Sequence, residues 1–276
     1  MSQDKVRAYY QSFDIREWER LTWPEGQLEY RITQSALNRH LPPAGKVLDL
    51  GGGAGRWTLW LAERGHSVTL ADLSPNLLAI AHDKVAATAV AANVKEIVTA
   101  DACDLSRWPD NSFDAVLCLG PFYHLVSKND REAAAEEIIR VMKPGGVLYC
   151  AYMPIYGFLR RTLALKDERR HLSDPKFVDQ LVSEGKFVND IDGRFNAGYG
   201  VRPDEIEPFW SQRGVKIEEL LSDSGFAASN ANDIAELAMS DAAAYERVMS
   251  IVEASAKDPS CLGSAVHLLF IGRKSH

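Results

Sequence analysis

The stretch VLDLGGGAGRW at residues 47–57 decides the fold. Its first four residues form an apolar run interrupted by one aspartate, which predicts a buried parallel strand. Glycines follow at positions 51, 52, 53 and 55, and the apolar positions then repeat at helical spacing until Gly65 supplies a stop. A strand, a glycine turn and a helix in this order predict a ligand site at the carboxyl end of a strand in an open α/β sheet. The missing Cβ atoms let a ligand approach the helix N-terminus.

The glycine spacing separates two classes of ligand. A dinucleotide-binding loop needs glycine or alanine at position 56, where this chain has Arg56, so a nicotinamide-dependent dehydrogenase is disfavoured. The pattern that is present, Asp49-x-Gly51-x-Gly53-x-Gly55, resembles motif I of the class I S-adenosylmethionine (SAM)-dependent methyltransferases. The resemblance implies a Rossmann-like α/β fold with a seven-stranded sheet whose last strand is antiparallel, and SAM as the cofactor. It also implies cofactor contacts from these four residues and from Arg56.

Acidic residues follow the next two predicted strands. Asp72, followed by Leu73, ends the second strand, where a carboxylate can accept hydrogen bonds from both ribose hydroxyls of an adenosine. The alternative is that Asp72 is a turn residue. By the family resemblance, Asp101 and Ala102 after the third strand contact the adenine ring. Leu119, at the end of the fourth strand, offers its carbonyl group to the amino group of SAM.

The segment after the fourth strand holds the candidate catalytic residues. Tyr123 and His124 are expected to face the acceptor, and Tyr10 is a third candidate from the N-terminal segment. A histidine can act as a general base near neutral pH, or His124 orients a loop through one hydrogen bond. Both roles remain open. Gly120-Pro121-Phe122-Tyr123 resembles only in part the motif of the amide-nitrogen methyltransferases.

Four segments are predicted along the chain. They are an N-terminal helical lid (1–40), the SAM-binding α/β core (41–151), a cap inserted after the fifth strand (152–201) and the remainder of the core (202–276). The segment RVMKPGGVL at 140–148 resembles the family's sequence ahead of the fifth strand. An apolar run at 265–272 predicts a last strand that is antiparallel and lies at the sheet edge. His66 is expected at the surface.

Aromatic residues crowd the predicted lid and recur in the predicted cap. In the lid they either fix a helix pair to the core or cover the cofactor, with Tyr10 and Trp18 facing the reacting methyl group, because an aromatic face attracts a sulfonium cation. Basic residues at 160–170 predict a solvated helix face, with docking of an acidic acceptor as the minor alternative. The candidate substrate-binding residues besides Trp18 are Tyr152, Tyr156, Phe195, Asn196 and Tyr199.

Composition excludes several classes of partner. The net charge is −7 and there is no long basic run, which argues against a nucleic-acid partner or an anionic membrane surface. The four cysteines form no C-x-x-C pair, and no H-x-x-x-H or clustered carboxylates suggest a metal. The polar N-terminus and the absence of a long apolar run favour a cytoplasmic protein, either a monomer or a homodimer.

The function expected from these features is SAM-dependent methyl transfer to a small-molecule acceptor, giving S-adenosylhomocysteine, in small-molecule or secondary metabolism. A second possibility is an enzyme similar to the azetidine-2-carboxylate synthases, which cyclises SAM and releases methylthioadenosine. An RNA or protein methyltransferase is a third possibility, and a non-catalytic SAM-binding module is a fourth. The cofactor motifs do not separate these functions, because the SAM site would be unchanged.

Overall fold

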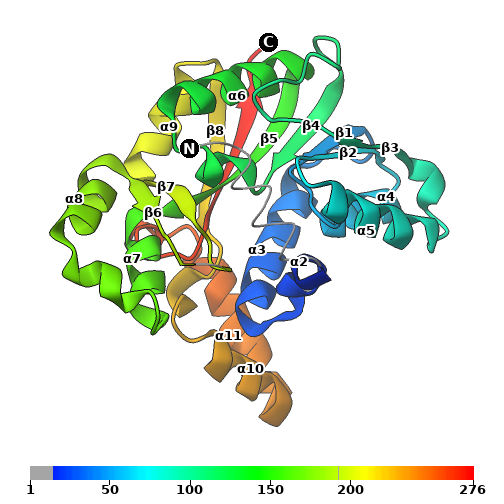
Figure 1. The fold of residues 1–276 in the computed structure, drawn as a ribbon. Helices are drawn as coiled ribbons and strands as arrows, with labels where there is room; N and C mark the ends of the chain where they lie inside the picture. Colours follow the sequence, from blue (N-terminus) through cyan, green and yellow to red (C-terminus); the bar gives the residue numbers. More distant parts are fainter. Residues whose placement is uncertain (1–14, 192) are drawn as a thin grey trace.

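The computed structural model describes residues 15–191 and 193–276, and the candidate Tyr10 lies outside them. Figure 1 shows a twisted sheet with helices on both faces. Within the described residues, seven strands follow one another in the main sheet in the order β3-β2-β1-β4-β5-β9-β8. Their bounds in this order are Val94–Thr99, Ser67–Asp72, Lys46–Leu50, Phe113–Cys118, Met142–Pro154, Leu268–Lys274 and Val215–Ser222. β9 is antiparallel to both neighbours, whereas β1 to β5 pair in parallel, so the predicted fold class is confirmed.

The prediction that the last strand lies at the sheet edge is wrong. β9 lies between β5 and β8, and β8 forms that edge. Four consecutive residues of β9, Leu268–Ile271, are buried. Leu268 and Phe270 pack in one hydrophobic cluster and Leu269 and Ile271 in another, so helices cover both faces of the strand. Such a continuous apolar run is typical of an interior strand, since an edge strand usually carries charged residues.

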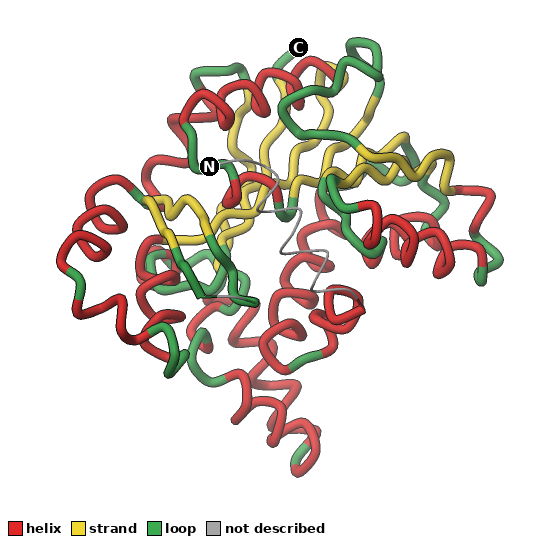
Figure 2. Tube along the Cα trace, in the orientation of Figure 1, coloured by secondary structure: helices red, strands yellow, loops and turns green. Residues whose placement is uncertain are grey.

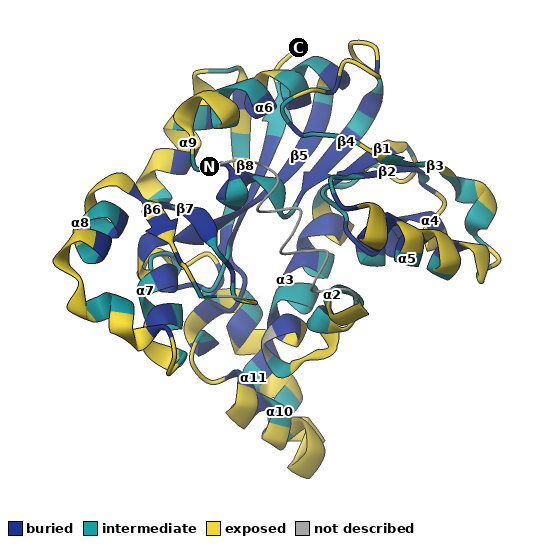
Figure 3. Cartoon of the chain, viewed as in Figure 1, coloured by how far each residue is buried: buried dark blue, intermediate teal, exposed yellow. Residues whose placement is uncertain are grey.

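The helices divide between the two faces of the sheet (Figures 2 and 3). α3 (Pro24–His40), α4 (Arg56–Glu63), α10 (Ala231–Ser240) and α11 (Ala242–Ser255) share one cluster, and α6 (Lys128–Val141) and α9 (Pro203–Ser211) share the other. α5 (Pro75–Ala86) packs on β2 and β3. α5 ends at Ala86, and Thr88 Oγ1 donates to the Val85 carbonyl just after it. None of the helices in the described ranges is both long and apolar enough to cross a bilayer.

Residues 155–201 build a small subsidiary unit beside the sheet. It contains α7 (Ile155–Ala164), α8 (Pro175–Glu184), β6 (Lys186–Val188) and β7 (Ala197–Val201). β7 pairs in parallel with the end of β5, where Met153 is opposite Gly200. Phe158, Phe177 and Phe187 form an aromatic core of this unit. The unit is therefore attached at the carboxyl end of β5, next to the end of β4.

His66 is not at the surface as predicted, because it is only 3% exposed. It lies between the end of α4 and the start of β2, and its backbone N–H donates to the Leu61 carbonyl of that helix. Burial lowers the pKa of its imidazole, which favours the neutral ring. The physical reason for the difference is that the glycine turn at Gly65 folds the chain back onto α4, which covers the residue that follows.

A chain of ion pairs attaches the N-terminal helices to the sheet. Arg20, in the 3₁₀ helix η1 (Arg20–Thr22), donates from its two terminal nitrogens to the Glu29 carboxylate at 2.6 and 3.0 Å. His267 Nδ1, just before β9, lies 3.5 Å from Glu29 Oε2 and 3.3 Å from Asp223 Oδ2. Burial alone would disfavour the imidazolium, but these two carboxylates outweigh it and raise the pKa of His267 to about 9. Residues far apart in the sequence thus share one buried charge network.

This network predicts a loss of stability at alkaline pH. A histidine whose folded pKa lies above its unfolded value stabilises the fold fully below pH 6.5, and this contribution is lost as the pH rises through about 9. We expect the free energy of unfolding to fall by up to about 3 kcal/mol over that interval, measured by urea unfolding. His267→Gln should flatten this pH dependence, whereas His82→Gln, at an exposed position, should leave it unchanged. An equal alkaline loss in His267→Gln would contradict the assignment.

The interior position of β9 predicts a second stability effect. The Phe270 side chain is fully buried and stacks on Trp210 with ring centroids 5.8 Å apart. Phe270→Ala should reduce the free energy of unfolding by about 3–5 kcal/mol, because the cavity cannot close between two packed faces. Arg273→Ala, at a side chain 41% exposed on the same strand, should change it by less than about 1 kcal/mol. Similar small losses in both variants would instead favour an edge position for β9.

Candidate cofactor and active site

A cavity opens at the carboxyl ends of β1, β2 and β4. Its empty volume is about 1270 Å³, part of which is open to solvent. The lining comes from the glycine loop, from the segments after β2, β3 and β4, and from α2 (Ile15–Glu19) with η1. The sequence-predicted residues that line it are Asp49, Gly51, Gly53, Arg56, Asp72, Leu73, Asp101, Ala102, Leu119, Tyr123 and His124. The carboxyl ends of neighbouring parallel strands meet at one edge of a sheet, which brings these segments together.

The glycines of the loop serve different purposes. Gly51, Gly53 and Gly55 have φ values of 71°, 53° and 83°, in the left-handed region that favours glycine. A Cβ on Gly51 would lie 2.5 Å from Pro121 Cδ, and a Cβ on Gly55 would lie 3.1 Å from Ala81 Cβ. Gly55 therefore faces α5 and does not line the cavity. At Gly53 a Cβ would lie 3.3 Å from Glu17 Cγ and 3.5 Å from Leu77 Cδ1, so side chains of α2 and α5 border this part of the loop.

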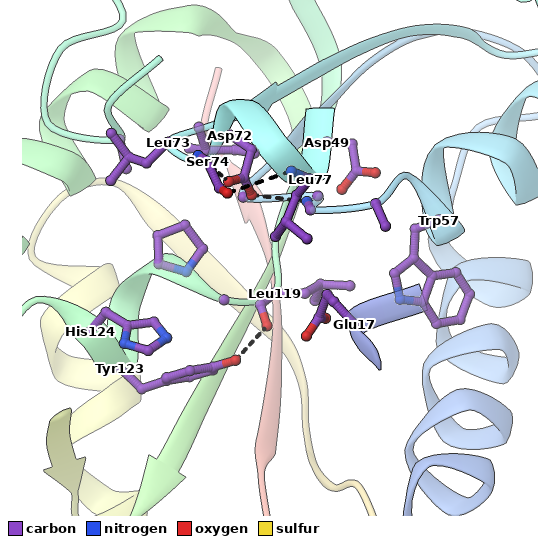
Figure 4. A pocket seen from close by; sticks show the side chains of 18 of the residues that line it. Glu17, Asp49, Trp57, Asp72, Leu73, Ser74, Leu77, Leu119, Tyr123 and His124 are labelled. Carbon is purple, nitrogen blue, oxygen red and sulfur yellow. Dashed lines mark hydrogen bonds between the residues drawn. The ribbon is translucent and has the colours of Figure 1, made fainter. Parts of the chain in front are cut away.

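Asp72 joins the glycine loop to the start of α5. Its Oδ2 accepts from the Gly53 N–H at 2.9 Å, and its Oδ1 accepts from the Ser74 N–H at 2.8 Å (Figure 4). Burial raises the pKa of its carboxyl group despite these hydrogen bonds. Asp72 therefore shapes the loop and also presents a desolvated carboxylate to the cavity, so the geometry combines the turn role and the ligand-facing role.

Two more carboxylates lie at neighbouring strand ends. Asp49 is 1% exposed, and its Oδ2 accepts from Thr58 Oγ1 at 2.7 Å. Burial raises its pKa to about 6, and the nearby Asp72 carboxylate adds to the shift. After β3, Asp101 Oδ1 accepts from the Cys103 N–H at 2.9 Å, which tightens the turn. Asp49, Asp72 and Asp101 therefore surround one cavity, and the first two carboxylates are held away from water.

Tyr123 and His124 belong to the 3₁₀ helix η3 (Pro121–His124) after β4. The Tyr123 hydroxyl donates to the Leu119 carbonyl at 3.5 Å (Figure 4). The His124 ring lies between Tyr123 and Phe195, with centroids 4.8 Å from each. Burial lowers the pKa of His124 to about 3, so its imidazole is neutral at neutral pH. A group with so low a pKa is a weak proton acceptor, which disfavours the base role.

Two aromatic candidates, Trp18 of the lid and Tyr152 of β5, are not among the described residues that line this cavity. The Trp18 ring is contacted by two cations, Arg56 at 4.9 Å and Lys84 at 4.8 Å from its centroid. Trp18 thus supports the Arg56 side chain from outside the cavity. Tyr152 lies in the core, where its hydroxyl accepts from Trp210 Nε1 at 2.6 Å.

The remaining cap candidates lie in the subsidiary unit. Tyr156 is 55% exposed on α7. The Arg131 guanidinium lies 3.4 Å from the centroid of the Tyr199 ring. The Asn196 carbonyl accepts from the Asn189 N–H at 2.7 Å, next to Phe195, which contacts His124. Phe195 is therefore linked to the cavity indirectly, because it contacts His124, which lines the cavity.

Sequence reasoning missed Glu17 and Arg20, which line the cavity from α2 and η1. Figure 4 shows the Glu17 carboxyl group between Leu119 and Trp57 in this view. α2 has only five residues, too few for a periodic pattern, and Arg20 is recognisable only through its partner Glu29. No local sequence signal would have identified either residue.

The described residues contain one group whose ligand atoms could approach a single metal ion. Atoms of Glu29, Asp223 and His267 all lie within 4.8 Å of one another. Both carboxylate oxygens of Glu29 already accept from Arg20, and Asp223 Oδ1 accepts from Ser224 Oγ at 2.9 Å. The His267 imidazolium and the Arg20 guanidinium supply the positive charge between these carboxylates. The group is therefore an ion-pair network.

Comparison with known proteins agrees with this geometry. Residues 47–146 match the family model described as a methyltransferase domain. The Bacillus subtilis protein YqeM, described as a putative methyltransferase, is 29% identical over 199 residues, which cover 69% of this chain and 76% of that protein. The tRNA 5-carboxymethoxyuridine methyltransferase of Escherichia coli is 32% identical over 145 residues, 50% of this chain and 53% of that protein. Apart from YqeM, the chain thus spans about half or less of the curated relatives it matches.

A solved structure extends the similarity over the whole fold. The Burkholderia thailandensis 1,6-didemethyltoxoflavin-N1-methyltransferase, with bound 1,6-didemethyltoxoflavin and S-adenosylhomocysteine, superposes with a TM-score of 0.56. The match covers 99% of this chain and 86% of that chain at 16% sequence identity. Residues 47–146 therefore match a methyltransferase domain, and the chain as a whole has the fold of that SAM-type methyltransferase.

Proposed function

We propose that the protein transfers the methyl group of SAM to a small-molecule acceptor and releases S-adenosylhomocysteine. The observation that carries this proposal is that Gly53, Asp72 and Asp101 line one cavity together with Tyr123 and His124. The first three residues suit the adenosine part of SAM. The last two lie at the end of β4, where the acceptor would meet the methyl group.

The donor half of the cavity fits SAM on chemical grounds. Gly53 lines the cavity and carries no Cβ, so an adenosine can approach its backbone closely. The Asp72 oxygens each accept one backbone hydrogen bond and keep lone pairs for ribose hydroxyl groups. Burial raises the pKa of Asp49 and Asp72, so a positively charged ligand beside them would be favoured. When bound, SAM supplies a methyl group already activated by its positive sulfur.

Because the methyl group is activated, the chain's own work is alignment and exclusion of water. η1 and α2 border the cavity on one side, and η3 borders it on another. We propose that His124 is a positioning residue, since its neutral ring packs between Tyr123 and Phe195. Tyr123 would then present its hydroxyl group to the acceptor side. No step in this scheme requires a metal.

The charges favour a small acceptor over RNA. Among the described residues, five acids line the cavity against two arginines, Arg20 and Arg56. Such a lining repels phosphodiesters. Two of the five basic residues at 160–170 are neutralised, because Arg161 pairs with Glu168 and Arg170 pairs with Asp190. The tRNA-modifying relative makes RNA the second acceptor class to be tested.

The test of the function is a product assay. The protein is incubated with SAM alone, with SAM and a small-molecule cell extract, and with SAM and total tRNA. We expect S-adenosylhomocysteine only with the small-molecule extract, and no change when EDTA is added. Methylthioadenosine from SAM alone would favour cyclisation, and activity with tRNA would favour RNA methylation. Binding of SAM without either product would contradict catalysis.

Asp72→Ala should weaken SAM binding by about 1–3 kcal/mol, because ribose hydrogen bonds to a buried carboxylate are lost. Isothermal titration calorimetry measures the effect, and thermal melting checks that the variant folds. Asp104→Ala is the matched control, since this acid caps the Ser106 N–H in an exposed turn. An unchanged affinity in Asp72→Ala would mean that the ribose is held elsewhere.

The low pKa of His124 predicts the pH dependence of catalysis. A group that titrates at about 3 is neutral throughout the pH range 5–8, so its protonation adds no inflection to kcat there. His124→Ala should lower kcat more than it changes the SAM affinity, because the ring positions Tyr123. An inflection near pH 6.5 that disappears in His124→Ala would restore the base role.

A further inference from the structure

Glu17 reaches the glycine loop from a different part of the chain. Its Cγ lies 3.3 Å from the point that a Cβ on Gly53 would occupy. The side chain is 21% exposed and lines the cavity with Asp49 and Asp72. The Glu17 side chain of α2 therefore lies against the glycine loop at Gly53 and forms part of the cavity wall.

Among the described residues, the basic group that pairs with Glu17 is Arg20, which Glu17 shares with Glu29. Arg20 Nε lies 3.3 Å from Glu17 Oε1, whereas both terminal nitrogens of Arg20 are directed to Glu29. The other charged groups that act on Glu17 are the carboxylates of Glu29 on α3 and Asp72 on β2. Burial raises the pKa of Glu17, the Arg20 charge opposes this, and these two carboxylates add to the rise. An additional positive charge in the cavity would stabilise the Glu17 carboxylate.

We propose that Glu17 is a specificity-determining residue whose carboxylate makes the cavity favour a positively charged ligand over its neutral counterpart. This inference rests on the proposed function, since it takes SAM as the ligand. SAM and S-adenosylhomocysteine share the adenosine, the amino group and the carboxylate, and they differ by one methyl group and one positive charge. Because the carboxylate loses this partner when the methyl group leaves, the demethylated product is held less tightly than SAM.

The experiment compares three ligands by isothermal titration calorimetry at pH 7.5. They are SAM, S-adenosylhomocysteine and sinefungin, which carries a protonated amine in place of the sulfonium. The wild-type protein should bind the two cationic ligands about tenfold more tightly than the neutral one. In Glu17→Gln this ratio should fall below about threefold through weaker binding of SAM and sinefungin, with S-adenosylhomocysteine changed less than about twofold. Glu19→Gln, an exposed acid on the same helix, is the control and should keep the ratio.

The outcomes separate this inference from the proposed function. Wild-type protein that binds none of the three ligands refutes both. Wild-type protein that binds SAM, with an unchanged ratio in Glu17→Gln, refutes the inference alone. Equal weakening of all three ligands also refutes it, because Glu17 would then contact the shared amino group or only support the loop.

A measurement on the wild-type protein keeps the inference testable if Glu17→Gln does not fold. Titrations at pH 5.5 in two buffers of different ionisation enthalpy give the number of protons released on binding. A positive charge beside a carboxyl group with a raised pKa expels its proton, so SAM should release more protons than S-adenosylhomocysteine. Equal release by the two ligands would overturn the proposal.

Discussion

The contact between the glycine loop and the ends of β2 and β4 is the constraint on which the site depends. A Cβ on Gly51 would meet Pro121 Cδ at 2.5 Å, and one on Gly52 would meet Leu70 Cδ1 at 2.4 Å. The backbone at Gly51 and Gly52 therefore packs so closely against its neighbours that no side chain fits at either position. This close packing holds the loop against the strand ends, so that Asp72 and Tyr123 face one cavity. A larger residue at either glycine would separate the donor half of the site from the acceptor half.

The cavity formed in this way concentrates negative charge. Asp49 and Asp72 lie beside the loop, and Glu17 approaches it from α2. The pKa of each of these carboxyl groups is raised by burial. The Arg20 guanidinium, which borders the cavity, is shared with Glu29 and through it with the His267 network. Arg20 and His267 thus anchor the N-terminal helices, and in the described lining of the cavity five acidic residues face two arginines.

The donor half of the site was predictable because its signals are local. The glycine loop is one continuous motif, and Asp72 and Asp101 are recognised by their position directly after apolar strands. The burial of β9 was equally visible as an unbroken apolar run, but its place in the sheet depends on pairing with β5 and β8, far away in the sequence. The aromatic content predicted that Trp18 and Tyr152 bind the substrate. In the structure the Trp18 ring instead contacts the Arg56 guanidinium, and the Tyr152 hydroxyl accepts a hydrogen bond from Trp210. Composition alone does not distinguish a ring that packs from one that binds.

The cavity walls away from the glycine loop depend on contacts that join distant segments. Glu17 and Arg20 reach the cavity because Glu29 on α3 binds Arg20, and Glu29 is fixed in turn by His267. On the opposite side, Phe195 of the subsidiary unit contacts His124, and β7 attaches that unit to the end of β5. Neither wall can move without breaking these contacts, whereas the glycine loop is held by its own packing. The side chains of these walls can therefore change while the glycine loop stays the same, so under the proposed function the acceptor would be determined by the walls.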